Sequence, residues 1–235
     1  MDGVLVVNKP QGWTSHDVVA FVRRKFGLKK VGHAGTLDPM ATGVLVILIG
    51  KLTKSSNQLM SGDKEYDATL TLGAESDTGD AWGKIIPSGG TIDLSPGRIE
   101  AAFKKFSGEI EQAVPMYSAA KYNGRKLYEF ARKGVTVAVE PKKVTIKKLE
   151  ISKIALPEVS FSLTCSKGTY VRQLAVDIGK DLGCGAYLSR LVRTRSGEFG
   201  IQDAVSVETL HKLNREELER HLRHCEAAPN HTGSG

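Results

Sequence analysis

The chain has 235 residues, 40% of them apolar, and a net charge of +7. This length fits one large domain, or one domain with a small appendage, and the apolar content excludes a chain that is disordered throughout. No run approaches the roughly 18 apolar residues of a membrane span, and no basic leader precedes the first apolar run, so we expect neither a membrane anchor nor a signal peptide. Three cysteines without Cys-x-x-Cys spacing argue against a disulfide framework or a zinc ribbon and predict a reducing, cytoplasmic location.

The first half of the chain has the patterns of short strands and one capped helix. Thr14 is a suitable N-cap for this helix and Gly27 a suitable stop. The expected elements are a strand over 3–8, a helix over 15–26, a strand or short buried helix over 43–49, a strand over 65–72 and a loop over 86–98.

The second half mixes the same two periodicities. The expected elements are a helix over 98–106, strands near 144–154 and 159–165, a helix over 169–182 and a polar helix or helix pair over 206–226. The chain has no internal repeat and no regular strand–helix–strand rhythm. These patterns predict an α+β fold.

The positive charge is concentrated in residues 121–148, the basic segment. It has nine basic and two acidic side chains, so its net charge of +7 (9 − 2) equals that of the whole chain. Three aromatic residues, Tyr122, Tyr128 and Phe130, alternate with the cations. Cations for phosphates and flat rings for unstacked bases suit an RNA-binding surface. The alternative is a solvated basic face whose aromatic residues belong to the core.

Three other motifs do not support a nucleotide or metal site. The sequence GKLT at 50–53 lacks the earlier glycine of a phosphate-binding loop and the Ser or Thr that follows its lysine directly. His221, His224 and Cys225 lie in a highly charged stretch that favours a solvated helix. The acidic stretch 75–80 lacks the closing glutamate of a calcium loop and fits polar turns better.

The stretch 33–45, HAGTLDPMATGVL, has one acid, Asp38, in an apolar setting rich in glycine. Without a second carboxylate or metal ligands nearby, it does not suggest a glycosidase pair or metal-assisted hydrolysis. A lone carboxylate in such a loop suits a nucleophile or a base, provided that an arginine keeps it ionised. The alternative is that Asp38 only caps a turn, for which Leu-Asp-Pro is a reasonable signature.

Five sequence blocks decide between these alternatives by resemblance. They are GVLVVNKPQGWTSHDVVAFVRR, KKVGHAGTLDPMATGVLVILIGKLTK, DKEYDATLTLGAESDTGDAWG, VPMYSAAKYNGRKLYEFARKG and SKGTYVRQLAVDIGKDLGCGAYLSRLVRTRSGEF. In this order, over about residues 3–207, they resemble the motifs of TruB-type tRNA pseudouridine synthases. The resemblance implies the pseudouridine synthase fold, an α+β fold with a mixed, mainly antiparallel central sheet flanked by helices and loops. It also implies isomerisation of uridine 55 in the T-loop of tRNA.

The resemblance implies roles for individual residues. Asp38 matches the catalytic aspartate, Tyr66 the tyrosine that stacks on the target base, and Arg172 the arginine that pairs with the aspartate. The other matched positions are His33, which contacts the displaced part of the RNA loop, Lys9 and Pro10, which buttress the site, Asp80, Tyr170, and the RNA-binding cations Arg125, Lys126, Arg132 and Lys133. Ser76 replaces the threonine that opens the family's Thr-Asp-x-x-Asp stretch, a mild departure.

The implied reaction breaks the N1–C1′ bond of uridine, turns the base and joins C5 to C1′. Because this is an isomerisation, no redox cofactor, ATP or metal is expected. The expected partner is the T stem-loop of tRNA, with no membrane and no obligatory protein partner, and the chain is expected to be a monomer. Extrusion of the base costs a few kcal/mol, which stacking and a basic surface offset.

The resemblance also implies a domain organisation. Residues 1–207 are expected to form the catalytic domain, with an insertion at about 113–143 that contacts RNA. Residues 208–235 are expected to be a helical tail, because the roughly 30 residues after the last matching block are too few for the family's C-terminal RNA-binding PUA domain.

Two other functions compete with this interpretation. One is a guide-RNA-dependent or ribosomal-RNA pseudouridine synthase of the same fold, against which the stand-alone form and the 113–143 insertion argue. The other is a tRNA-binding chaperone with a spent active site. Such a protein would have lost the aspartate, the arginine or the tyrosine, and all three are present.

Overall fold

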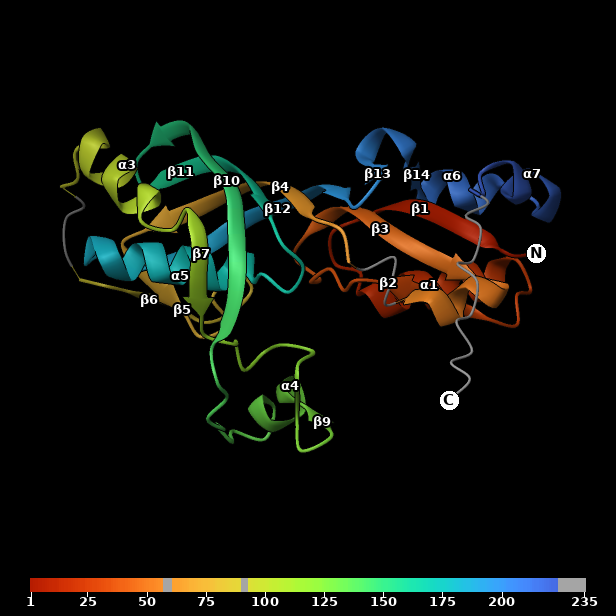
Figure 1. Cartoon of the computed structure of the whole chain (residues 1–235), viewed down its shortest axis with the longest axis horizontal. Coiled ribbons are helices and arrows are strands. Elements are labelled where there is room, and N and C mark those ends of the chain that lie inside the picture. Colours follow the sequence, from red (N-terminus) through yellow and green to blue (C-terminus); the bar gives the residue numbers. More distant parts are fainter. Residues whose placement is uncertain (57–60, 90–92, 224–235) are drawn as a thin grey trace, which may run out of the picture. The chain divides into compact units, whose positions relative to one another are not determined.

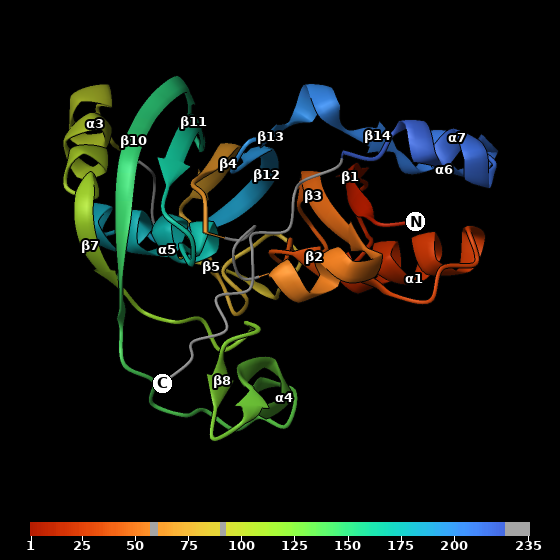
Figure 2. The same ribbon diagram turned by 45° about the vertical axis from the view of Figure 1, so that its right-hand side comes forward.

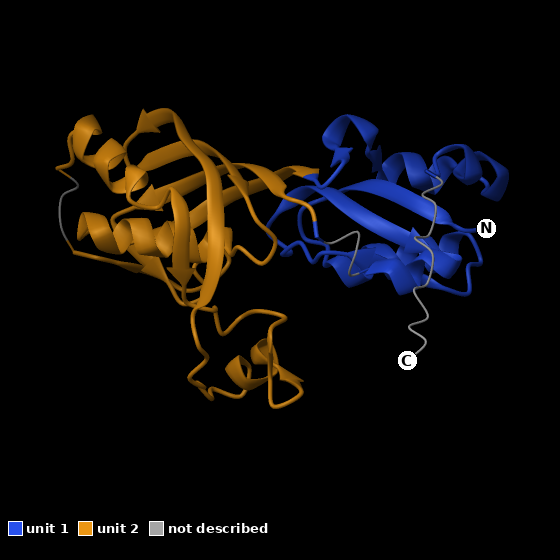
Figure 3. Cartoon of the chain, in the orientation of Figure 1, with its two compact units in different colours: residues 1–61, 196–235 blue, residues 62–195 orange. Residues whose placement is uncertain are grey.

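The structure is a computed structural model that describes residues 1–56, 61–89 and 93–223 (Figure 1). It confirms the α+β class, because helices lie beside a sheet of mainly antiparallel strands. The chain divides into two compact units (Figure 3). The first unit comprises Met1–Ser61 and Ser196–Gly235, and the second comprises Gly62–Arg195.

The first unit is built on a small mixed sheet. Its strands are β1 (Gly3–Lys9), β2 (Val31–Ala34), β3 (Thr42–Ile49) and β14 (Val205–Ser206). β3 pairs antiparallel with both β1 and β2, whereas β14 runs parallel to β1. The predicted strand over 3–8 is confirmed, and the apolar run at 43–49 is a strand and not a helix.

The first unit's core explains why this apolar run is continuous. Val4 and Val6 of β1 join Val46 and Leu48 of β3 in one buried cluster, which Phe199 completes. The intervening side chains of both strands are also buried. Because successive side chains of a strand point to opposite faces, burial of both faces requires an unbroken apolar sequence.

Helix α1 (Ser15–Lys25) packs against β2. Thr14 and Asp17 form a reciprocal capping box, in which the Asp17 amide lies 3.0 Å from the Thr14 hydroxyl and the Thr14 amide lies 2.8 Å from the Asp17 carboxylate. Gly27, at φ +61°, follows the end of the helix. The predicted cap, bounds and stop are confirmed to within one residue.

The second unit contributes five neighbouring strands of the sheet, in the order β12-β4-β11-β10-β7. Its strands are β4 (Lys64–Leu72), β7 (Gly108–Gln112), β10 (Lys142–Ala155), β11 (Glu158–Cys165) and β12 (Ala186–Ser196). Helices α3 (Pro96–Lys104) and α5 (Val171–Leu182) pack on each other, and α3 also contacts β10. Gly183 ends α5 in the left-handed conformation, as its position predicts.

The prediction of a loop over 86–98 was wrong at both ends. Strand β6 (Ile85–Pro87) pairs with β5 (Ala74–Ser76), and α3 already begins at Pro96. Ser95 caps this helix and proline is well suited to its first position, so the signal for the earlier start is local. The helix also ends at Lys104, two residues before the expected end.

Several short elements complete the described chain. They are η1 (Gly50–Ser55), β8 (Lys121–Tyr122), β9 (Arg125–Lys126), α4 (Leu127–Ala131), β13 (Phe199–Gly200), η2 (Ile201–Asp203), α6 (Val207–Lys212) and α7 (Arg215–Arg220). The polar helix pair is confirmed up to residue 223, whereas His224 and Cys225 lie outside the described residues. Over the described ranges, no helix is long and apolar enough to cross a membrane.

Candidate active site and RNA-binding surface

Asp38 lies in a loop (35–41) that joins β2 to β3 in the first unit. Gly35 and Gly43 have φ of +93° and +101°, a conformation that side-chain-bearing residues rarely adopt, so both glycines are needed to shape the connection. Leu37 and Met40 are buried on either side, while Asp38 is partly exposed. The buried neighbours fix the loop and leave the carboxylate accessible.

Two buried polar side chains anchor this Asp38 loop. The ammonium of Lys9 is fully buried and donates hydrogen bonds to the carbonyls of Pro10, Trp13 and Pro39 at 2.9, 2.6 and 3.4 Å. The hydroxyl of Ser15 accepts a bond from the Leu37 amide at 2.8 Å and lies 3.1 Å from the Leu37 carbonyl. These contacts hold the backbone on both sides of Asp38.

The remaining first-unit residues with predicted roles are His33, which lies just before this loop in the chain, and Pro10, whose carbonyl shares the Lys9 ammonium with that of Pro39. His33 is in β2, opposite Ile47 of β3, and is partly exposed. Pro10 directly follows β1, and its carbonyl is one of the Lys9 acceptors. Lys9 contacts Pro39 of the loop, whereas Pro10 is an acceptor of Lys9, and the buttressing role of the two residues stays a prediction.

Arg172, in the first turn of α5, is buried and makes three polar contacts within the second unit. Its guanidinium donates to the carbonyls of Thr78 and Tyr117, each at 2.7 Å, and its Nε lies 3.6 Å from a carboxylate oxygen of Asp80. The planar guanidinium can serve several acceptors in fixed directions at once, which an ammonium cannot do.

Asp80 is the centre of a tight polar turn. Its carboxylate accepts from the Thr78 hydroxyl at 2.8 Å and from the Trp82 amide at 3.0 Å, and its carbonyl accepts from the Ser76 hydroxyl at 2.6 Å. Gly79 contributes a φ of +76°. This geometry agrees with the predicted polar turn. No group of residues suited to hold a metal ion occurs in the part of the chain that the structure describes.

Tyr66 and Tyr170 are positioned by different elements of the second unit. Tyr66 is a buried residue of β4, opposite Leu163 of β11. Tyr170 is the N-cap residue of α5 and exchanges two hydrogen bonds with the buried side chain of Gln112, at 2.7 and 3.0 Å. Gln112 thus ties the end of β7 to the start of the helix that carries Arg172.

Beside Tyr66, β4 begins with a buried lysine. Burial, followed by the neighbouring charge of Arg193, lowers the pKa of Lys64. Cys165 lies opposite Lys64 in β11, and burial raises the pKa of its thiol to about 11. A thiol of this kind stays protonated at neutral pH and is unsuited to nucleophilic catalysis.

The structure assigns the predicted catalytic residues to different units. Asp38 belongs to the first unit, whereas Tyr66 and Arg172 belong to the second. The pairing of Arg172 with Asp38 therefore stays a prediction. What is described for Arg172 is its pairing with Asp80.

The first part of the basic segment, residues 121–133, forms a hairpin followed by a short helix. β8 and β9 pair antiparallel around Asn123 and Gly124, both with positive φ, the sequence and conformation that a two-residue hairpin turn favours. Figures 1 and 2 both show this part standing away from the sheet of the second unit. Leu127 is its one fully buried side chain among the described residues of this range.

The aromatic residues of this part pack with cations and not in a large core. Arg125 lies 5.1 Å from the ring centre of Phe130, and Arg132 lies 5.3 Å from that of Tyr128. The ammonium of Lys126 lies 5.5 Å from the ring centre of Tyr128. The cations predicted to bind RNA are all exposed. This arrangement contradicts the alternative of core aromatics and keeps charge and flat rings together at the surface.

The second part of the basic segment, residues 134–148, is different, because three of its four lysines are paired. Lys143, Lys147 and Lys148 lie 3.8, 2.6 and 2.9 Å from carboxylates of Glu109, Asp63 and Glu150. Within the basic segment, the positive charge least compensated by neighbouring acids is therefore in residues 121–133. All residues of this range are described, and its one ion pair joins Arg125 to Glu129.

Sequence reasoning missed Gln112, Thr78 and Tyr117, which hold Tyr170 and Arg172. Two of these contacts use backbone carbonyls, which leave no trace in residue type. The hairpin was also missed, although Asn123-Gly124 between two-residue polar strands is a recognised turn signal.

Comparison with solved structures places the fold in a known group. The chain aligns with a chain of a Cbf5–Nop10–Gar1 complex with a TM-score of 0.68 and 33% identity, over 88% of this chain and 52% of that one. It aligns with a chain of an H/ACA RNP bound to a substrate RNA containing 2′-deoxyuridine with a TM-score of 0.69 and 28% identity. This second alignment covers 94% of this chain and 56% of the other chain, so the chain spans about half the length of these two neighbours.

Family models define the class as pseudouridylate synthases. The model of the TruB family pseudouridylate synthase N-terminal domain matches residues 23–171, and that of the tRNA pseudouridylate synthase B C-terminal domain matches residues 172–228. The chain is 46% identical to tRNA pseudouridine synthase B of Opitutus terrae, over 94% of this chain and 92% of the relative. It is 49% identical to tRNA pseudouridine synthase B of Alkaliphilus oremlandii, over 92% of this chain and 72% of the relative. The chain therefore belongs to the TruB family of pseudouridylate synthases.

Proposed function

We propose that this protein converts the uridine at position 55, in the T-loop of tRNA, to pseudouridine, and that Asp38 is the catalytic carboxylate. The observation that carries the proposal is the Asp38 loop. It holds one partly exposed carboxylate on a backbone fixed by Lys9 and Ser15. These two buried side chains hold the backbone directly before and after the single acid.

The reaction needs a carboxylate that acts on one nucleotide lifted out of the stack. The N1–C1′ bond breaks, the base turns, and C5 bonds to C1′. The hydrogen on C5 then leaves as a proton, and N1 takes up a proton. Atoms balance without a co-reactant. Asp38 has three chemically sound roles, namely attack at C1′, addition to the base, or removal of a proton from the sugar.

The other predicted residues serve this nucleotide. Tyr66 stacks on the target base, and Arg172 pairs with Asp38 as well as with Asp80 and so orients the acid. His33 contacts the displaced part of the RNA loop. The exposed cations of residues 121–133 bind phosphates, and the rings between them offer stacking surfaces.

The test uses the purified chain and an unmodified tRNA transcript, with no cofactor, guide RNA or second protein. Pseudouridine is mapped by carbodiimide treatment and primer extension. A stop at position 55 that depends on the protein supports the proposal. Product only at another position would overturn the site assignment, and product only after addition of a guide RNA would favour the guide-dependent alternative.

The role of Asp38 is distinguished with the same transcript carrying deuterium at C2′ of the target uridine. A primary isotope effect on the single-turnover rate identifies proton removal from the sugar. An unchanged rate leaves attack at C1′ or addition to the base.

A further inference from the structure

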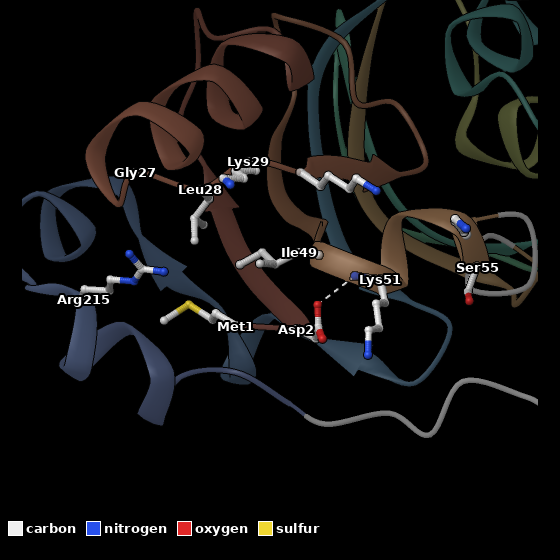
Figure 4. A pocket seen from close by; sticks show the side chains of 12 residues that line it. Met1, Asp2, Gly27, Leu28, Lys29, Ile49, Lys51, Ser55 and Arg215 are labelled. Atoms are coloured by element: carbon white, nitrogen blue, oxygen red, sulfur yellow. Dashed lines mark hydrogen bonds between the residues drawn. The ribbon is translucent and has the colours of Figure 1, made fainter.

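We propose that the first unit carries a second phosphate-binding site for tRNA, separate from both the Asp38 loop and the basic segment. It is a cavity of about 690 Å³, lined by residues from the N-terminal strand, the α1–β2 connection, η1 and α7. Figure 4 shows its labelled side chains, with Arg215 on the α7 side and Lys51 on the η1 side. The inference rests on the proposed function in so far as the ligand is tRNA.

The chemistry of the lining is strongly cationic. Five of the lining residues are basic, namely Lys29, Lys30, Lys51, Lys54 and Arg215, and one, Asp2, is acidic. All five cations are exposed, and over the described ranges none of them forms an ion pair with a carboxylate. By contrast, Lys143, Lys147 and Lys148 of β10 each lie within 4 Å of a carboxylate.

The one acid of the cavity has a structural task. The carboxylate of Asp2 accepts a hydrogen bond from the Lys51 amide at 2.8 Å, at the start of η1 (Figure 4). A Cβ atom at position 50 would lie 1.8 Å from that carboxylate oxygen, so Gly50 is needed for this contact. Gly50 in turn donates from its amide to the Lys30 carbonyl at 2.9 Å. These contacts bring the lysine pairs 29–30 and 51–54 to the same cavity.

The residue types favour phosphodiester groups over a base or an apolar ligand. None of the described residues that line the cavity is aromatic, so these residues offer no stacking surface. Lysine ammonium groups act as mobile point charges that bind phosphate without a fixed geometry. Leu28 and Ile49 supply a buried apolar floor. Four exposed lysines and an arginine around such a floor suit a polyanion that lies across the opening.

The position within the first unit indicates which part of the RNA is bound. The Asp38 loop precedes β3, whereas Ile49 of the cavity is the last residue of that strand, so the cavity and the loop lie at opposite ends of the same strand. Eight residues of extended chain span about 23 Å. The phosphates bound here therefore belong to a part of the tRNA about that far from the target uridine.

The experiment compares two variants with the same loss of charge. In the pocket variant Lys29, Lys51 and Lys54 are replaced by glutamine. In the matched control the exposed residues Lys104, Lys153 and Lys180 of the second unit are replaced in the same way. Binding of the unmodified tRNA transcript is measured at several salt concentrations, and thermal unfolding checks that both variants are folded.

The expected result is a fall of about 2–3 in the slope of log affinity against log salt for the pocket variant, at 0.7–0.9 for each lost phosphate contact. The control variant changes the slope by less than one. Equal slopes for wild type and pocket variant, or equal changes in both variants, overturn the proposal. Tight binding of AMP or inorganic phosphate that the pocket variant loses, with an unchanged tRNA slope, also overturns it, because the site then serves a small anion.

Pseudouridine formation by the wild-type protein is followed in the same samples. Wild-type protein that binds tRNA but forms no pseudouridine contradicts the proposed function alone. Wild-type protein that forms pseudouridine while the pocket variant keeps its salt slope contradicts only the second site.

Discussion

The Asp38 loop and residues 121–133 differ in how firmly the fold holds them. The loop is fixed by buried hydrogen bonds from Lys9 and Ser15 and by two glycines in left-handed conformation. Residues 121–133 have one fully buried side chain, and their exposed cations lie over exposed or half-exposed rings. A group that performs chemistry needs a fixed position, whereas groups that bind phosphates need charge and reach.

This contrast predicts that substitutions in the loop reduce the rate of the bound complex, whereas substitutions in residues 121–133 reduce affinity.

Replacing Asp38 by asparagine should reduce the single-turnover rate by about 10⁴-fold or more, as removal of a reacting group does in other enzymes. Asparagine keeps the shape of the side chain and cannot attack or take a proton. Binding of tRNA, measured by filter retention, should remain within about threefold of wild type.

Replacing Arg172 by leucine should reduce the rate by about 10²-fold or more and also lower the thermal stability. The substitution leaves the buried Asp80 carboxylate and the carbonyls of Thr78 and Tyr117 without this donor. The Arg172→Lys variant keeps the charge but loses the planar donors, and it should recover only part of the stability. Wild-type rates in both variants would contradict the role assigned to the guanidinium.

Replacing Arg125, Lys126, Arg132 and Lys133 together by glutamine should weaken tRNA binding and lower its salt slope by about 2–4, if three or four of them contact phosphates. The rate of the bound complex should fall far less than the affinity. The measurement is filter binding at several salt concentrations with single-turnover rates on the same variant. An unchanged slope would show that these cations are only solvated.

Replacing Ser15 by alanine should lower the free energy of unfolding by about 1–3 kcal/mol, because the buried Leu37 amide loses its acceptor. The single-turnover rate should fall several-fold while KM for tRNA stays the same. The control is Ser206→Ala, which removes the cap of α6 at a cost of about 1 kcal/mol. Equal loss of rate in both variants would mean that only general stability was affected.

The smallest expected effect concerns Cys165, beside the strand that carries Tyr66. Because burial raises the pKa of its thiol to about 11, the thiolate fraction stays small up to pH 9 and rises as the pH approaches 11. In a variant with Cys184→Ser and Cys225→Ser, iodoacetamide at pH 8 should therefore not modify the folded protein. Rapid labelling before unfolding would show that the β4–β11 pair opens readily.

Local patterns in the sequence predicted those features of the fold that depend on residues within one helix or strand. The capped helix α1, the strand β4 and the glycine stop of α5 were confirmed because caps and alternation are local signals. The choice between strand and helix for residues 43–49 could not be made from the sequence. A run buried on both faces has no periodicity to read.

The site was predicted from the sequence only in its residue types. The lone acid, the flanking glycines and the exposed cations are visible in the sequence, and the structure gives the glycines their left-handed φ. The contacts of Lys9 with Pro39 and of Arg172 with Thr78 join distant positions through backbone carbonyls. Nothing in the residue type of the acceptor marks such a contact, so it had to come from the fold.

The measurement that tests the central claim most directly is a tRNA titration of the single-turnover rate at position 55, made on wild type, Asp38→Asn and the variant with four substituted cations. We expect Asp38→Asn to bind tRNA with the affinity of the wild type and to form no product at saturating tRNA. We expect the variant with four substituted cations to need more tRNA and then to react at a rate close to that of wild type. Substantial product from Asp38→Asn at saturating tRNA would contradict the account.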